Sequence, residues 1–251
     1  MSTTRSDQPA DVTKFGPFDR WRNGDDGQVS VRLPSDFQHP PLSGTADSLI
    51  AHFEATTDRD PLPLRNPHRE LKVNDEQRRS ATPAAVLIPV VDRPEGPTVL
   101  LTQRDESISY AGHICFPGGR RDPEDDSALT NALREAEEEI GLAPERVRIL
   151  GRLGDYVTHS GFRIAPFVGL VQAPLELVPQ PGEVAAILEI PLSLVLRSDS
   201  YELRGWQDSE RAHFIFPCDD VFVTGPTVSI LMGLYETLLG TQEGSVSGGQ
   251  S

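Results

Sequence analysis

The chain has 251 residues, of which 37% are hydrophobic, and it carries a formal net charge of −15 at pH 7 with an isoelectric point near 4.8. A charge of this size repels nucleic acid and anionic membrane surfaces, so we expect neither as a partner. The N-terminus shows no secretory signal, no apolar run approaches a membrane span, and two cysteines are too few for a disulfide framework. These features predict a cytoplasmic protein.

Residues 1–80 are predicted to form an irregular extension with one short helix. Residues 1–45 are polar and rich in Pro, Gly and Asp, and they contain an aromatic cluster that would dock on the main domain, formed by Phe15, Phe18 and Trp21. Residues 46–55 place apolar side chains at helical spacing, which predicts the short helix. Residues 57–81 are again typical of a loop.

Residues 81–240 are predicted to form one α+β domain, followed by a disordered Gly/Ser-rich tail over 241–251. Apolar runs and alternating patterns predict strands over 83–91, 97–104, 147–157, 162–171 and 183–192, a hairpin from 200–207 and 212–217, and a closing helix over 226–239. This order of elements fits a mixed β-sheet sandwiched between α-helices.

The chemistry is concentrated in residues 116–142, where a Pro-Gly-Gly turn precedes a helix rich in carboxylates. Glu135, Glu138 and Glu139 stand at i, i+3 and i+4 and are expected to project from one face, where like charges repel. Hard divalent cations with oxygen ligands, such as Mg²⁺ or Mn²⁺, would compensate this repulsion. Arg134, four residues before Glu138, would hold one carboxylate by two hydrogen bonds.

Three glycines frame this helix. Gly118 and Gly119 allow a sharp turn and leave a carbonyl available to a metal, and Gly141 is expected to form a left-handed cap at the end of the helix. The alternative interpretation is an exposed, charge-rich surface helix, which is what most glutamate runs are. Seven specified positions make a chance coincidence rare, so we favour a metal site.

The stretch resembles the Nudix box, G-x5-E-x7-R-E-U-x-E-E-x-G-U with U apolar. Its second half is matched in full by Arg134, Glu135, Ala136, Glu138, Glu139, Gly141 and Leu142. The first half departs: Asp125 stands where the box has Glu, six residues after Gly119, and eight residues separate it from Arg134. The resemblance implies a Nudix-type fold.

A second pattern resembles the branch of Nudix hydrolases that cleave coenzyme A. It consists of L-L-T-x-R, a short loop, then a Gly and F-P-G-G, and the matching residues are Leu100 to Thr102, Arg104, Gly112 and Phe116 to Gly119. That branch usually carries a second Arg about five residues after the first. This chain has Ser107 to Tyr110 there, in a loop one residue shorter, so either the substrate or its recognition differs.

The resemblance implies a metal-dependent pyrophosphohydrolase that splits coenzyme A or acyl-CoA into 3′,5′-ADP and the 4′-phosphopantetheine half. The implied metal ligands are Gly118, Glu135, Glu138 and Glu139, the implied catalytic residues are Glu135, Glu138, Arg134 and Glu183, and the implied substrate-binding residues are Arg104, Gly112 and Gly119. The metals would neutralise the diphosphate and activate a water for in-line attack, with one glutamate accepting its proton.

Two alternatives stay open for the function: a Nudix hydrolase of another nucleoside diphosphate derivative, such as ADP-ribose or NADH, and a Nudix domain that only binds a nucleotide.

The extension of residues 1–80 would supply a homodimer contact or cover the pocket. His113 and His159 are interpreted as solvated loop residues, and Cys115 as a core residue without a basic neighbour to lower its pKa.

Overall fold

The computed structural model describes residues 28–33, 37–57, 60–61, 64, 74–206, 212–218 and 221–246. The aromatic cluster predicted near the N-terminus lies outside these residues. None of the described helices combines the length and hydrophobicity that crossing a bilayer requires.

The main sheet is built around two long parallel strands, β2 (Thr82–Asp92) and β8 (Phe162–Gln172), which pair along their whole length. Both read as nearly continuous apolar runs because both faces of the sheet are covered. Antiparallel neighbours complete the mixed sheet in the order β4-β3-β2-β8-β6, with β5, β7 and β9 pairing to β2, β8 and β3. Their bounds are β3 (Thr98–Arg104), β4 (Ile114–Cys115), β5 (Gly118–Arg120), β6 (Val147–Arg152), β7 (Tyr156–Val157) and β9 (Val184–Pro191).

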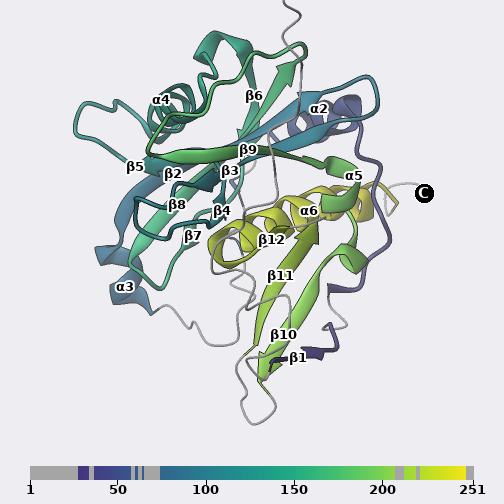
Figure 1. Ribbon diagram of the computed structural model, residues 1–251. Helices are drawn as coiled ribbons and strands as arrows, with labels where there is room; N and C mark the ends of the chain where they lie inside the picture. Colours follow the sequence, from purple (N-terminus) through teal and green to yellow (C-terminus); the bar gives the residue numbers. More distant parts are fainter. Residues whose placement is uncertain are drawn as a thin grey trace, which may run out of the picture.

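Helices cover both faces of this sheet, as predicted (Figure 1). Helix α4 (Ala128–Ile140) packs Ala132, Ala136 and Ile140 on one face, against β2 and β8. Helices α2 (Ala46–Ala55) and α6 (Gly225–Val246) contribute to the larger core on the other face. The prediction of an α+β sandwich is therefore confirmed.

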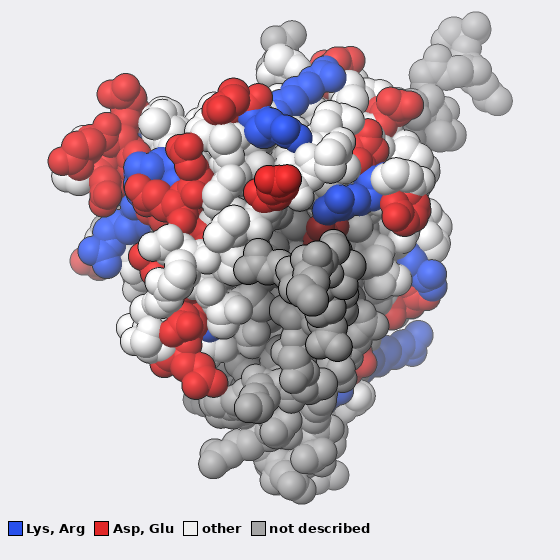
Figure 2. Space-filling view, turned by 45° about the horizontal axis from the view of Figure 1, so that its top comes forward, with Lys and Arg blue, Asp and Glu red and all other residues white. Residues whose placement is uncertain are grey.

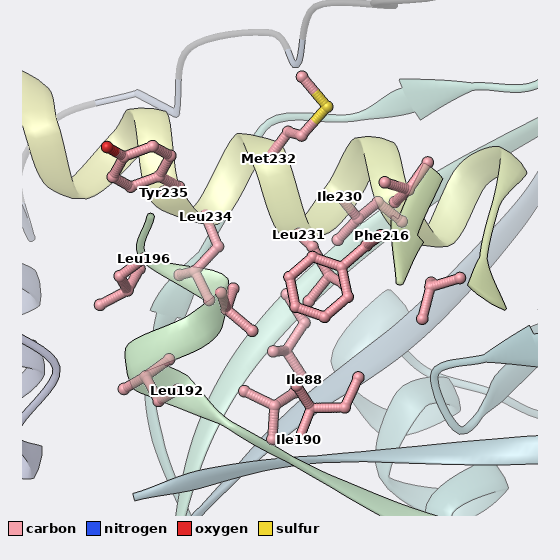
Figure 3. Close-up of a cluster of buried hydrophobic side chains, with 14 of the residues drawn as sticks. Ile88, Ile190, Leu192, Leu196, Phe216, Ile230, Leu231, Met232, Leu234 and Tyr235 are labelled. Carbon is pink, nitrogen blue, oxygen red and sulfur yellow. The ribbon is translucent and has the colours of Figure 1, made fainter. Parts of the chain in front are cut away.

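A second, antiparallel sheet lies beside α6 and consists of β1 (Gln28–Val31), β10 (Glu202–Trp206), β11 (Ala212–Cys218) and β12 (Val221–Val223). The predicted hairpin is its β10–β11 pair. Figure 3 shows how the two sheets share one core: α6 and the short helix α5 (Leu192–Val195) place leucines against Ile88 of β2, Ile190 of β9 and Phe216 of β11.

The N-terminal segment is more regular than the sequence predicts. Strand β1 pairs with β10, and a helix, α3 (Asp75–Ser80), forms where we expected a loop. The reason for α3 is a capping box, in which the side chain of Asn74 accepts from the Gln77 N–H at 2.8 Å and the Gln77 side chain accepts from the Asn74 N–H at 2.9 Å.

Residues before α2 are tied into the main core. Buried Phe37 meets Tyr201, Phe214 and Tyr235 edge to face, and the Tyr235 hydroxyl donates to the Pro40 carbonyl at 2.9 Å. Part of the predicted extension therefore belongs to the folded body, held by these aromatic pairs as well as by the pairing of β1 with β10.

At the other end, α6 runs to Val246, so the predicted tail over 241–251 begins too early. The composition of this tail does not exclude a helix. Glycine and polar residues cost a helix at most about 1 kcal/mol each relative to alanine, and they keep the backbone N–H that continues the helix. The sequence beyond Val246 lies outside the described residues.

Two short 3₁₀ turns complete the elements, Pro144–Arg146 before β6 and Ser198–Ser200 before β10.

Candidate active site

The site is formed where β5 runs alongside α4. Gly118 has φ of +152°, and a Cβ there would lie 2.4 Å from the Ala85 carbonyl oxygen. A Cβ on Gly119 would lie 2.6 Å from a carboxylate oxygen of Glu135. Gly118 is therefore required, because the backbone of β2 approaches the turn more closely than a side chain allows, and any side chain at Gly119 would displace the Glu135 carboxylate.

Helix α4 is capped at both ends, which fixes the direction of its side chains. At its start the Ser127 hydroxyl accepts from the Thr130 N–H at 3.0 Å, and at its end Gly141 adopts the predicted left-handed conformation, with φ of +68°. The Gly141 N–H donates to the Glu137 carbonyl at 2.9 Å. These caps fix the rotation of the helix about its axis, which decides that the glutamates face β5.

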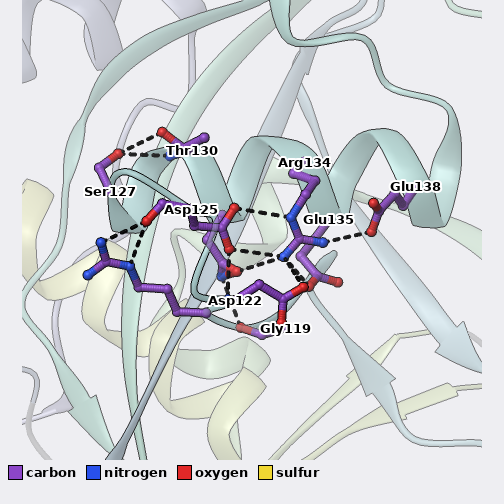
Figure 4. A network of polar contacts seen from close by, with 10 residues as sticks. Gly119, Asp122, Asp125, Ser127, Thr130, Arg134, Glu135 and Glu138 are labelled. Carbon is purple, nitrogen blue, oxygen red and sulfur yellow. Dashed lines mark hydrogen bonds and ion pairs between the residues drawn. The ribbon is translucent and has the colours of Figure 1, made fainter.

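Arg134 is the centre of the polar network on α4 (Figure 4). Its Nε and Nη2 donate to the two oxygens of Asp125, both at 3.1 Å, while Nη1 donates to Glu138 at 2.7 Å and Nη2 to Glu135 at 2.9 Å. The paired hydrogen bonds thus go to Asp125 rather than to a helix glutamate. They hold the pKa of the buried Asp125 carboxyl below its usual range.

Asn131 is a site residue that the sequence reasoning missed. Its side chain is buried and bridges two parts of the site: Nδ2 donates to the Gly119 carbonyl at 3.1 Å, and Oδ1 accepts from Arg134 Nη2 at 3.1 Å. The feature of the sequence that could have revealed Asn131 is its spacing, because it stands three residues before Arg134 on the same helix face. A polar residue on an otherwise buried stripe requires such partners.

The three helix glutamates fall into two environments. Glu139 is 6% exposed and accepts from the Gly118 N–H at 3.2 Å; burial raises its pKa to about 7, and the charges of Glu135 and Glu183 add to the shift. Burial likewise raises the pKa of Glu135, against the hydrogen bond from Arg134. The side chain of Glu138, by contrast, is 58% exposed. Glu135 and Glu139 therefore lie together against β5, and Glu138 lies at the rim.

No group of three or more His, Cys, Asp or Glu side chains within the described residues is already arranged to hold a metal ion. The Glu138 carboxylate is paired with Arg134, apart from the two inward glutamates. The donor set nonetheless fits a hard divalent cation, because it offers carboxylate oxygens whose pKa values are raised chiefly by burial and secondly by neighbouring carboxylates, and a bound cation would offset both costs of ionisation. A cation held by all three glutamates would have to compete with Arg134 for Glu138.

Two residues predicted from outside the helix act on Glu139 through their charges. Arg104 ends β3, and its charge acts on the Glu139 carboxyl in the direction that favours ionisation. Glu183 precedes β9, and its charge acts in the opposite direction. Gly112 has φ of +71°, and its N–H donates to the Arg104 carbonyl at 3.0 Å, so in this structure the backbone donor of Gly112 binds the protein itself.

The remaining candidates behave as structural residues. Burial raises the pKa of the Cys115 thiol, which packs beside the Thr102 hydroxyl and is no activated nucleophile. His113 and His159 are exposed loop residues. Desolvation, and secondly the Arg104 charge, lower the pKa of His113.

The fold and this helix define a class of protein, and comparison with known families identifies it: residues 81–221 match the NUDIX domain model, so the chain belongs to the Nudix hydrolase family. Among named relatives, it is 41% identical over 157 residues to an uncharacterized Nudix hydrolase, NudL, of Yersinia enterocolitica, covering 60% of this chain and 78% of that protein. NudL of Photorhabdus laumondii is 42% identical over 139 residues, covering 55% and 72%.

Solved structures that the chain distantly resembles include the Nudix hydrolase RenU of M. smegmatis, with a TM-score of 0.41 and 19% identity over 68% of this chain and 89% of that one. The NUDIX domain of Shewanella oneidensis NrtR complexed with ADP ribose has a TM-score of 0.41 and 16% identity over 68% and 94%. These likenesses are too distant to bear on the substrate.

Proposed function

We propose that this chain is a divalent-metal-dependent pyrophosphohydrolase that cleaves the diphosphate of coenzyme A or an acyl derivative, releasing 3′,5′-ADP and the 4′-phosphopantetheine half. The observation that carries the proposal is the Glu135–Glu139 pair against the Gly118–Gly119 turn, where the charges of Arg104 and Glu183 also act on Glu139. The pair concentrates negative charge in a half-buried place, which suits a site that takes up cations and, through them, a diphosphate.

Each residue would have a separate task. Glu135, Glu138 and Glu139, with the Gly118 carbonyl, would hold Mg²⁺ or Mn²⁺, which neutralises the diphosphate and lowers the pKa of a bound water. Arg134 orients Glu135 and Glu138 through its hydrogen bonds, as it already does in the structure. Arg104, at the end of β3, would contact a phosphate oxygen.

The reaction balances as a hydrolysis. The water oxygen forms a bond to one phosphorus, the bond from that phosphorus to the bridging oxygen breaks, and the bridging oxygen leaves with the other half. The water proton would pass to a carboxylate, which is one of the helix glutamates or Glu183. No covalent intermediate with the protein is required.

The choice of coenzyme A depends on the L-L-T-x-R and F-P-G-G resemblance, and the second candidate substrate class is ADP-ribose or NADH. A non-catalytic nucleotide-binding module is the remaining alternative, and the intact helix carboxylates favour the enzyme over it. A homodimer in the cytoplasm stays a prediction.

The test is a comparison of Glu138→Gln with Glu137→Gln. Both residues are exposed neighbours on α4, but Glu138 contacts Arg134 at the site and Glu137 has no predicted role there. Hydrolysis of coenzyme A in Mg²⁺ or Mn²⁺ should fall at least 100-fold in Glu138→Gln and stay within about twofold in Glu137→Gln. Equal rates in the two variants would contradict the assigned metal role.

A further inference from the structure

The loop between β3 and β4 carries an unusual tyrosine. Tyr110 is 64% exposed, and with φ of +61° it is the one non-glycine residue with positive φ in the described part of the chain. A bulky side chain in that conformation is strained, and an exposed aromatic ring gains little from packing. Neither feature contributes to stability, which directs attention to a binding role.

The backbone around Tyr110 is held firmly. The His113 N–H donates to the Tyr110 carbonyl at 3.1 Å, and the two rings meet edge to face with their centroids 5.6 Å apart. The Arg104 N–H donates to the His113 carbonyl at 3.0 Å. The ring of Tyr110 is therefore presented to solvent from a fixed position, supported on one side by an aromatic neighbour.

This position is at the rim of the candidate active site. Arg104 Nε donates to the Ser109 carbonyl at 2.9 Å, so the guanidinium that acts on Glu139 also holds the residue next to Tyr110. On the far side of the loop, the Ser107 hydroxyl donates to the Gly182 carbonyl at 3.2 Å, beside Glu183. The loop with Tyr110 is thus fastened to Arg104 and to Gly182, and the charges of Arg104 and of Glu183, the neighbour of Gly182, act on Glu139.

We propose that Tyr110, supported by His113, is the surface on which the nucleobase of the substrate stacks. The proposal rests on the proposed function, because it assigns the base of the same nucleoside diphosphate. Every base offers a π face, and a tyrosine ring stacks on it without adding charge.

The experiment measures binding, so that it does not depend on turnover. Isothermal titration in Mg²⁺ would give the affinities of ADP and of inorganic pyrophosphate for the wild type and for Tyr110→Phe, Tyr110→Leu and Tyr110→Ala. Val178→Ala is the matched control, because Val178 is a similarly exposed apolar residue, at 66%, next to the end of α4. Melting curves confirm that each variant is folded.

We expect Tyr110→Leu and Tyr110→Ala to weaken ADP binding by roughly 10-fold or more while pyrophosphate binding changes less than about twofold. Tyr110→Phe should keep wild-type affinity, and so should Val178→Ala. Equal loss for ADP and pyrophosphate, wild-type ADP affinity in Tyr110→Leu, or no ADP binding by the wild type would each overturn the proposal.

The outcome also separates this proposal from the enzymatic one. A chain that hydrolyses its substrate but binds ADP equally well without the tyrosine ring keeps its proposed function and loses the stacking surface. A chain that hydrolyses nothing but loses ADP selectively in Tyr110→Leu has the stacking surface without the activity.

Discussion

The side-chain amide of Asn131 donates to the carbonyl of Gly119 across 3.1 Å and so connects helix α4 to the glycine turn of β5. Its other end accepts from Arg134, and the side chain is buried between them. Together with the hydrogen bond from the Gly118 N–H to Glu139, this residue links the helix glutamates to the turn. A buried amide with both ends bonded is costly to disturb, because each lost partner leaves an unsatisfied polar group.

Replacing Asn131 by Leu should lower kcat by at least 10-fold and leave KM within about threefold, because the glutamates would shift relative to the turn. The free energy of unfolding should fall by about 1–3 kcal/mol, as expected for leaving buried partners unsatisfied. Urea unfolding and steady-state kinetics measure the two effects. A stability loss with unchanged kcat would mean that Asn131 only packs.

Arg134→Lys tests the paired hydrogen bonds to Asp125. Lysine keeps the charge but offers no planar pair of donors, so buried Asp125 would lose the two hydrogen bonds that it accepts from Arg134. We expect a loss of about 2–4 kcal/mol in the free energy of unfolding. Arg197→Lys is the matched control, since Arg197 also binds one carboxylate, Asp199, through two donors but on the surface. That variant should lose much less stability than Arg134→Lys, and equal losses would contradict the role given to the buried pair.

Gly119→Ala should abolish most activity, because the added methyl would occupy the space of the Glu135 carboxylate. We expect a fall in kcat/KM of at least 10-fold with a melting temperature near that of the wild type. Gly161→Ala is the comparison: Gly161 has φ of +84° in open space, so it should lose stability from backbone strain and keep its activity. If Gly161→Ala loses more activity than Gly119→Ala, the close approach of the Glu135 carboxylate to Gly119 does not matter for activity.

The pKa of Glu139 predicts a pH dependence in the metal-free protein. The folded state keeps this proton up to about pH 7, whereas the unfolded chain releases it near 4.5. The folded state is therefore penalised progressively as the pH rises from 4.5 to 7, by up to about 3 kcal/mol. Glu139→Gln removes the penalty, so with EDTA present it should gain stability relative to the wild type between pH 5 and pH 7.5. If the difference in stability between Glu139→Gln and the wild type is the same at pH 5 and at pH 7.5, the raised pKa of Glu139 is contradicted.

The sequence predicted the parts of the fold that depend on local pattern. The apolar run before Asp92 and the helix over 46–55 have the predicted type and nearly the predicted bounds, because burial on both faces or on one stripe leaves a regular signature. The cap at Gly141 follows from glycine's freedom at positive φ. Helix α3 and the contacts of Phe37 were missed because they depend on a short capping box and on aromatic partners distant in sequence.

In the candidate site, too, the features that follow from local spacing could be predicted and those that depend on tertiary packing could not. The glutamates and glycines were found because helical spacing brings them together, but their environments were not. Glu138 and Glu139 are adjacent in sequence, yet one is exposed and the other buried, since consecutive helix positions point about 100° apart and only one of them faces β5. The paired bonds from Arg134 to Asp125 depend on how a loop folds back, which spacing does not encode.

The most direct test of the proposed function is an analysis of products after incubation with Mg²⁺ or Mn²⁺ and, separately, coenzyme A, ADP-ribose, NADH and a nucleoside triphosphate. The account predicts 3′,5′-ADP and 4′-phosphopantetheine from coenzyme A, and no such products from Glu138→Gln. Cleavage of ADP-ribose or NADH in place of coenzyme A would contradict the substrate, and no cleavage of any of them would contradict the enzyme.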